Sequence, residues 1–164
     1  MAEIRLKAYG TAAAVFVLDR LTKMAVEARL SFFDEKSVIP GFFKIVRSQN
    51  RGVAFGFFDE STSAWRTTLL IVAALGAVAL LIGMLWNSRR LDRWSVWGFA
   101  LILGGAAGNL YDRIAAGHVT DSLLVYIGQY QWPTFNVADS AIVVGSGLLL
   151  LDMLRSKRQA THVS

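Results

Sequence analysis

Stretches of mostly apolar residues alternate with polar segments along the chain. TTLLIVAALGAVALLIGMLW, residues 67–86, carries no charge, and neither does the stretch from Trp94 to Tyr111. A third stretch, residues 136–151, contains Asp139 as its only charged residue. Since a helix of about 20 mostly apolar residues can cross a membrane, each of these stretches is a candidate span.

The N-terminal stretch is the fourth candidate, although Asp19, Arg20 and Lys23 interrupt it. Basic residues followed by an apolar segment could also form a signal peptide. No small-residue cleavage motif follows, and the charged residues break up the downstream part, so we interpret the stretch as a retained helix. The pattern predicts an all-α polytopic membrane protein with four transmembrane helices, at about 9–28, 67–86, 94–113 and 136–154.

Two longer polar segments, about 30–64 and 115–135, separate these helices. The first contains SVIPGFFKIVRS, in which Pro40-Gly41 is a turn signal, and predicts a small extended platform. The second ends in QYQWPTFN, whose aromatic residues suit a membrane interface.

Composition agrees with a single integral membrane domain. Of the 164 residues, 54% are hydrophobic and only 18% are charged, against about 25% charged residues in soluble domains. The mean hydropathy is +0.45. The net charge of +5 could suggest nucleic acid, but the basic residues form short clusters between apolar stretches. We therefore expect membrane lipid, and no nucleic acid, as a partner.

The basic clusters predict the orientation of the helices. Arg5 and Lys7 precede the first helix, NSRRLDR joins the second to the third, and RSKR follows the fourth. The segment 30–64 has balanced charges, and 115–135 has no Lys or Arg. The positive-inside rule places both termini in the cytoplasm and the two longer loops outside.

Several polar residues fall at similar depth in this topology. Asp139 lies 13 residues before Asp152, roughly 20 Å from the inner boundary at the rise of an α-helix. The same arithmetic places Asp19, Asn109 and Asp112 in the outer half of the membrane. Charged groups at that depth usually face the bundle interior and have a function.

Structural roles are open for some of these residues. Asp112 could equally be an interfacial cap, and Asn136 or Asp139 could cap the fourth helix. Asp19 and Lys23 stand four residues apart, which favours a structural ion pair.

Candidate chemistry is limited by the absence of cysteine and the presence of only His118 and His162. Disulfides and thiolate nucleophiles are excluded, and we expect neither a metal nor a cofactor. A pair formed by His118 and Ser122 is conceivable, but no nucleophile elbow supports it. Carboxylates remain: Asp121 in the second loop and Asp139 at the head of the fourth helix could meet, share a proton and activate water.

Five short motifs follow one another along the chain: LDRLTK, NRGVAF, GGAAGNLYDR, GHVTD and FNVADSAI. In their order and spacing they resemble the motifs of bacterial lipoprotein signal peptidases, the signal peptidase II family, and the resemblance covers about residues 15 to 155. It implies an aspartyl endopeptidase of the bacterial plasma (inner) membrane with its active site toward the outer face. The substrates would be prolipoproteins whose cysteine carries diacylglycerol, cleaved just before that cysteine. The resemblance also implies inhibition by globomycin, and we expect a monomer.

The motif positions imply roles for individual residues. Asp121 and Asp139 would be the catalytic pair. Supporting or substrate-contacting residues would be Asn50, Gly52, Asn109, Arg113, Asn136 and Ala138, with Asp19 and Lys23 structural. Ser122 stands where the family usually has Phe, and Val53 where Ala is common, and neither change removes a catalytic group.

Two other functions remain as alternatives. A small transporter or channel subunit could use Asp19 and Asp139 as an ion relay, but no internal repeat supports it. A non-catalytic scaffold would leave the clustering of Asp and Asn residues unexplained.

Overall fold

The computed structural model describes residues 2–52, 64–87 and 91–161. Its elements follow the order α1 (Ala2–Glu27), β1 (Glu35–Ile39), β2 (Phe43–Asn50), α2 (Ala64–Trp86), α3 (Arg93–Ala116), β3 (Val119–Ile127), β4 (Tyr130–Gln131) and α4 (Val137–Thr161). The fold is therefore mostly helical with a small antiparallel sheet. Val53, Arg89, Arg90 and His162, which the sequence interpretation used, lie outside the described residues.

Helix α3 is the centre of the bundle, because it packs against α1, α2 and α4. The apolar core, which includes Ala12, Leu85 and Ala100, lies among α1, α2 and α3. Glycines allow the close approach of α3 to its neighbours. A Cβ on Gly105 would lie 2.4 Å from the carbonyl oxygen of Ala138 in α4, and one on Gly104 would lie 2.5 Å from that of Ala12 in α1.

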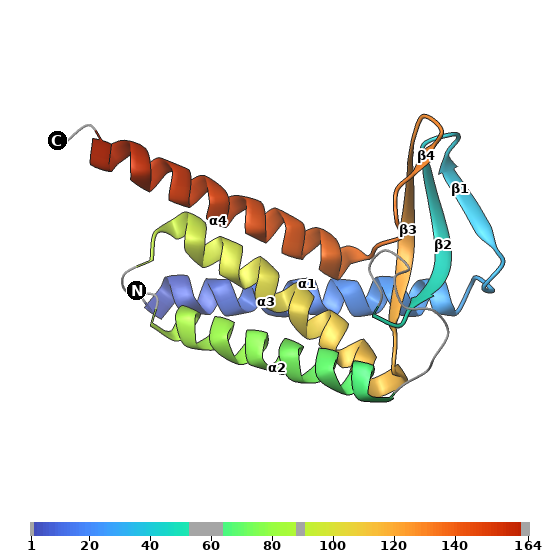
Figure 1. Ribbon diagram of the computed structural model, residues 1–164, viewed down its shortest axis with the longest axis horizontal. Helices are drawn as coiled ribbons and strands as arrows, with labels where there is room; N and C mark the ends of the chain where they lie inside the picture. Colours follow the sequence, from blue (N-terminus) through green and yellow to red (C-terminus); the bar gives the residue numbers. More distant parts are fainter. Residues whose placement is uncertain (1, 53–63, 88–90, 162–164) are drawn as a thin grey trace.

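The sheet stands at one end of the bundle, while the start of α1 and the end of α4 lie at the other (Figure 1). Its strand order is β1-β2-β3-β4, with antiparallel pairing throughout. The pairing of β2 with β3 joins the two loops and aligns Ser48 with Asp121 and Asn50 with Val119. The predicted platform is present, and the second loop contributes a strand to it that the sequence did not predict. Consecutive polar residues, Thr120 to Ser122, hide the alternation typical of a half-buried strand.

Within the described part of the chain, two helical stretches are long and apolar enough to cross a membrane: Trp65–Trp86 in α2 and Val137–Arg155 in α4. Helices α1 and α3 carry buried charged residues in their sheet-proximal halves, such as Lys23 and Asp112. The count of four spans therefore stays a prediction.

Candidate active site

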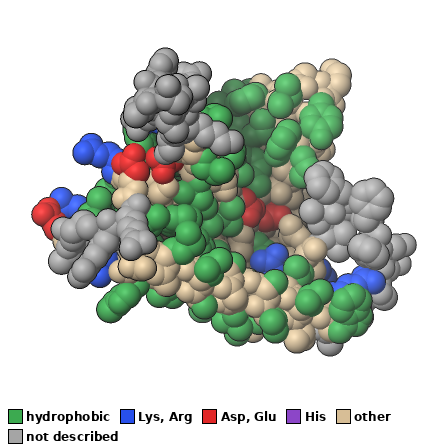
Figure 2. All heavy atoms as spheres, turned by 60° about the vertical axis from the view of Figure 1, so that its left-hand side comes forward, with side chains coloured by type: hydrophobic (Ala, Val, Ile, Leu, Met, Phe, Trp, Pro, Cys, Tyr) green, Lys and Arg blue, Asp and Glu red, His purple; other side chains and the backbone are tan. Residues whose placement is uncertain are grey.

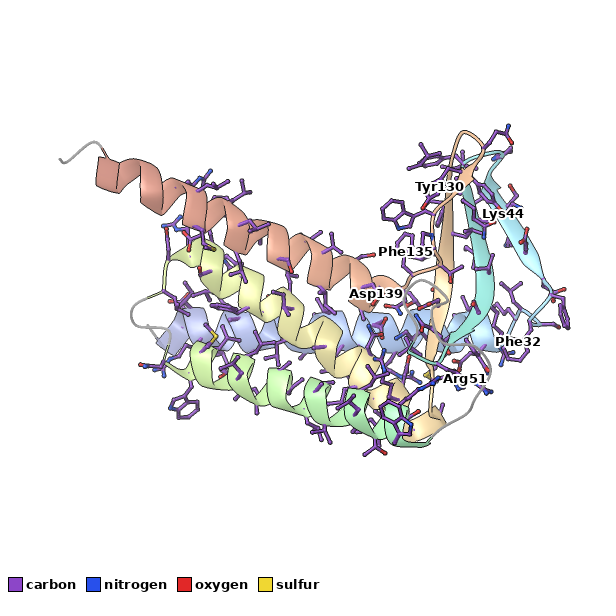
Figure 3. The ribbon with its side chains drawn as sticks, in the orientation of Figure 1. Phe32, Lys44, Arg51, Tyr130, Phe135 and Asp139 are labelled. Atoms are coloured by element: carbon purple, nitrogen blue, oxygen red, sulfur yellow. The ribbon has the colours of Figure 1, made fainter. Side chains whose placement is uncertain are left out.

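Asn136 and Asp139 begin α4 with reciprocal hydrogen bonds. The backbone N–H of Asp139 donates to Oδ1 of Asn136 at 2.9 Å, and the N–H of Asn136 donates to Oδ2 of Asp139 at 3.3 Å. This is the pattern of a capping box. Figure 3 shows Asp139 where α4 meets the sheet, with Phe135 on the segment leading into the helix. The cap predicted for Asn136 is present, and it fixes the backbone on which Asp139 stands.

Asp121 projects from β3 into the same region and is 1% exposed. Its Oδ1 accepts a hydrogen bond from Nδ2 of Asn136 at 2.9 Å, and its Oδ2 accepts one from Nδ2 of Asn50 at 3.2 Å. The Asn50 amide is oriented by Gly52, whose N–H donates to Oδ1 of Asn50 at 2.9 Å. Gly52 has φ +104°, and a Cβ there would lie 2.1 Å from Cδ1 of Leu70. Glycine is therefore required at this position.

Asn109 of α3 completes the connection between the two carboxyl groups. Its Nδ2 donates to Oδ1 of Asp139 at 2.7 Å, and its Oδ1 accepts from Nδ2 of Asn136 at 3.3 Å. One asparagine, Asn136, thus bonds to Asp139 through the backbone and to Asp121 through the side chain. The structure brings Asp121 and Asp139 together, although 18 residues separate them in the sequence.

The environment of Asp121 favours its protonated form. Burial, and secondly the charge of Asp139, raise the pKa of Asp121 from 3.8 to about 6. Hydrogen bonds from Asn136 and Asn50 oppose this rise, because they stabilise the carboxylate. A carboxyl group that binds its proton this tightly beside a second carboxylate suits acid–base chemistry.

Arg113, one turn after Asn109, supplies positive charge to the pair. Its guanidinium interacts electrostatically with Asp139 and Asp121. Nη1 donates to the carbonyl oxygen of Asn109 at 3.2 Å, whereas Nε is buried and has no hydrogen-bond partner among the described residues. Arg113 therefore has a donor to offer a ligand carbonyl or oxyanion.

A buried ion cluster supports the site from behind. Nζ of Lys23 lies 2.7 Å from Oδ2 of Asp19 and 2.7 Å from Oδ2 of Asp112, and Arg20 also pairs with Asp112. Asp19 and Lys23 are 0% exposed and Asp112 is 4% exposed. The predicted Asp19–Lys23 ion pair is present. Asp112 faces inward to two cations, Lys23 and Arg20, and the interfacial depth considered for it stays a prediction. The sequence did not predict the pairing of Asp112 with Arg20.

The other residues singled out in the sequence lie in the protein interior or away from the two carboxyl groups. Ala138 is fully buried, and its N–H donates to Oδ1 of Asp19 at 3.0 Å. His118 does not pair with Ser122: its Nδ1 lies 2.9 Å from the carbonyl oxygen of Ala116, and the N–H of Ser122 donates to Phe135. No group of three or more potential metal ligands occurs among the described residues. Sequence reasoning missed the contact of Thr120 Oγ1 with Glu27, which joins β3 to α1 at 2.6 Å.

Comparison with known proteins gives a consistent picture. Residues 11–155 match the family model described as signal peptidase (SPase) II. The chain is 62% identical to the lipoprotein signal peptidase of Solibacter usitatus over 164 residues, which is 100% of both chains. It is 44% identical to that of Pseudomonas aeruginosa over 152 residues, 90% of this chain and 89% of the other. A solved bacterial membrane enzyme at 25% identity superimposes with a TM-score of 0.82, covering 92% of this chain and 89% of that one.

Proposed function

The chain belongs to the signal peptidase II family, and from that premise we propose that Asp121 and Asp139 are the catalytic pair with which it cleaves lipoprotein signal peptides. It is an aspartic-type peptidase of a bacterial membrane, and it acts on lipoproteins. The observation that carries the proposed pair is the position of Asn136, which hydrogen-bonds to both carboxyl groups.

Hydrolysis by this pair would follow from one shared proton. The ionised carboxylate takes a proton from water as the water oxygen attacks the scissile carbonyl carbon, while the protonated carboxyl donates to the carbonyl oxygen. The raised pKa of Asp121 suits a carboxyl group that carries the shared proton during part of the cycle. Collapse of the tetrahedral intermediate then breaks the C–N bond, and the amine leaves with a proton from the pair.

Neighbouring polar groups have supporting roles in this proposal. Asn50 and Asn136 hold Asp121, and Asn109 holds Asp139. The free Nε of Arg113 would donate to the substrate backbone or to the developing oxyanion. Gly52 keeps Asn50 in place, and Ala138 allows α4 to approach α1 and α3.

The substrate class in this proposal is a prolipoprotein already carrying diacylglycerol on its cysteine, cleaved just before that residue. Acyl chains anchored in the outer leaflet would hold the scissile bond near the membrane surface. Acidic side chains lie in a hollow near the middle of the face in Figure 2, among hydrophobic side chains that suit lipid. We further propose that a globomycin-like peptide would occupy the same place.

The membrane arrangement belongs to the same proposal. Four spans with both termini in the cytoplasm would place the sheet and the acidic pair at the outer, periplasmic face of a multi-pass monomer. The position of the sheet at the end of the bundle opposite to the start of α1 supports this arrangement (Figure 1).

The test is a cleavage assay with the purified full-length protein and one prolipoprotein, with and without diacylglycerol on its cysteine. We expect cleavage of the lipidated form only. Asp121→Asn and Asp139→Asn should each lower kcat at least about 10⁴-fold, because neither variant can share the proton. Glu35→Gln, at an exposed carboxylate on β1, is the matched control and should retain full activity. Full activity in either Asn variant would exclude the catalytic pair.

A further inference from the structure

Lys23 of α1 lies at the centre of the buried cluster, where its Nζ contacts three oxygen atoms. Nζ contacts Oδ2 of Asp19 and Oδ2 of Asp112, each at 2.7 Å, and Oδ1 of Asn109 at 3.1 Å. An ammonium group has three N–H donors and no acceptor. The two carboxylates pair with its charge, the amide oxygen of Asn109 accepts its hydrogen bond, and the side chain is 0% exposed.

The contact with Lys23 decides which way the Asn109 amide points. Only the oxygen of the amide can face an ammonium group, and Nδ2 of Asn136 donates to this same oxygen. A flipped amide would direct its NH₂ group at both donors and lose both bonds. With Oδ1 held in this way, Nδ2 of Asn109 faces Oδ1 of Asp139 at 2.7 Å.

We propose that Lys23 is a positioning residue for cleavage, acting on Asp139 through the amide of Asn109. The inference rests on the catalytic role proposed above for Asp139. The effect of Lys23 on Asp139 is indirect: Lys23 fixes Asn109, which holds Oδ1 of Asp139 while the N–H of Asn136 holds Oδ2. The plane of the carboxylate is then set, and its remaining lone pairs are directed for water.

The surrounding charges determine which variants can test this role. Within the cluster, Asp19 and Asp112 balance Lys23 and Arg20, and Asp121 and Arg113 lie on the side of the catalytic pair. Loss of Lys23 alone would leave a buried carboxylate without its cation, which is strongly destabilising. Lys23→Met is therefore combined with Asp19→Asn, in which the retained amide oxygen can still accept from Ala138. A second double variant, Lys23→Met with Asp112→Asn, also keeps the net charge of the cluster, but it leaves Asp19 without its ion-pair partner and should be the less stable of the two.

The decisive measurement is kcat and KM, together with Tm, for the purified variants and the lipidated substrate. We expect each double variant to lower kcat by about 10- to 100-fold with KM within about threefold, because a misplaced catalytic group affects the chemical step more than binding. Arg20→Gln is the matched control, since it removes the other cation on Asp112 and leaves the bond between Lys23 and Asn109 in place. Arg20→Gln and Asp19→Asn alone should lower Tm and keep kcat within about threefold.

The outcomes separate this inference from the proposed function. If Asp139→Asn is inactive while a folded double variant keeps the kcat of Asp19→Asn, the role of Lys23 is excluded and the catalytic pair stands. An equal loss of kcat in Arg20→Gln and the double variants would also exclude it, since the effect would then be general. Activity in Asp139→Asn would instead overturn the catalytic pair. If neither double variant folds while Arg20→Gln does, Lys23 is structural and the positioning role is rejected.

Discussion

Asn136 combines two roles that are usually considered as alternatives. As the first residue of a capping box it satisfies backbone N–H groups at the start of α4, and its Nδ2 bonds to Asp121. A side chain that caps a helix has a fixed orientation, because the helix backbone holds its oxygen. The amide nitrogen is then directed without further support. The cap is therefore the means by which the position of Asp139 and that of Asp121 are coupled.

The pKa of Asp121 has a consequence for stability. Folding raises this pKa from 3.8 to about 6, so the folded protein binds the proton more tightly than the unfolded chain. The contribution of Asp121 to the free energy of unfolding therefore falls as pH rises from about 4 to about 6, and it stays lost above that range. The full shift corresponds to roughly 3 kcal/mol.

We expect Asp121→Asn to be more stable than the unmodified protein at pH 7.5 by on the order of 1–3 kcal/mol, because the neutral amide avoids the buried charge. The measurement is Tm in detergent between pH 4 and pH 8 for both proteins. The difference in Tm between Asp121→Asn and the unmodified protein should increase from pH 4 to pH 6. A constant difference across this range would contradict the raised pKa of Asp121.

Gly52 offers a second test at single-residue resolution. In Gly52→Ala, the φ of +104° is strained for a residue with a Cβ, and the new Cβ also displaces the flexible Cδ1 of Leu70, 2.1 Å away. We therefore expect the backbone to move and the bond to Asn50 to be lost. We expect kcat to fall about tenfold or more and stability to fall by more than about 1 kcal/mol. Gly41→Ala is the control, because Gly41 has φ +73° with open space around it. It should lower stability modestly and leave kcat unchanged; equal effects of the two substitutions would refute the steric argument.

At the level of elements, three sets of contacts position the site. Helix α3 packs against α4, strand β2 pairs with β3, and α1 contacts both α3 and the two strands. The first brings Asn109 to Asp139, and the second brings Asn50 to Asp121. In both contacts the backbones of the two elements lie close together. The helix contact in particular requires Gly105, because Ala138 of α4 lies directly over it.

The dependence on close helix packing can be tested with two glycines. Gly105→Ala places a Cβ 2.4 Å from the carbonyl oxygen of Ala138, so the start of α4 must shift away from α3. We expect a loss of about 1–3 kcal/mol in stability and a loss of activity, since Asp139 moves with the helix. Gly147→Ala has nothing within 4 Å, and it should leave activity intact and stabilise α4 slightly, because Ala favours helix more than Gly. Both can be measured as Tm and kcat in detergent, and an unaffected Gly105→Ala would contradict the close packing of α3 and α4.

Sequence patterns predicted the elements that have strong periodicity or long apolar runs. They predicted the helices, the platform, the Asp19–Lys23 pair and the cap on α4, because each depends on residues near one another in the chain. Strand β3 was not predicted, since its polar residues face a buried site rather than solvent. The Arg20–Asp112 pair and the orientation of Asn109 depend on packing between α1 and α3, which no local pattern encodes. The proposed catalytic pair came from motif resemblance; spacing alone only allowed it.

On the scale of the whole molecule, polar and apolar interactions occupy opposite ends of the bundle. The apolar core around Leu85 and Ala100 lies at the end where α2 finishes and α3 begins, while the buried charges lie near the sheet. Large hydrophobic side chains are exposed along the helices, including Leu69 and Leu80 on α2 and Val143 and Leu150 on α4. Apolar surface of this extent is rare on soluble monomers and suits contact with lipid.

The proposed orientation of the bundle in the membrane, with the sheet outside the cell, can be tested with fusion proteins. With four spans, the end of α4 and its basic residues would lie in the cytoplasm, and the turn at Gly128 between β3 and β4 would lie outside. Alkaline phosphatase, which becomes active only outside the cytoplasm, should be inactive when fused after Ser164 and active when inserted at Gly128. Green fluorescent protein at the same two positions should give the opposite pattern. An active C-terminal phosphatase would contradict the proposed arrangement, and it would place the basic segment 155–158 on the outer face against the positive-inside rule. An inactive fusion at Gly128 would then indicate four spans in the inverted orientation, and an active one an odd number of spans.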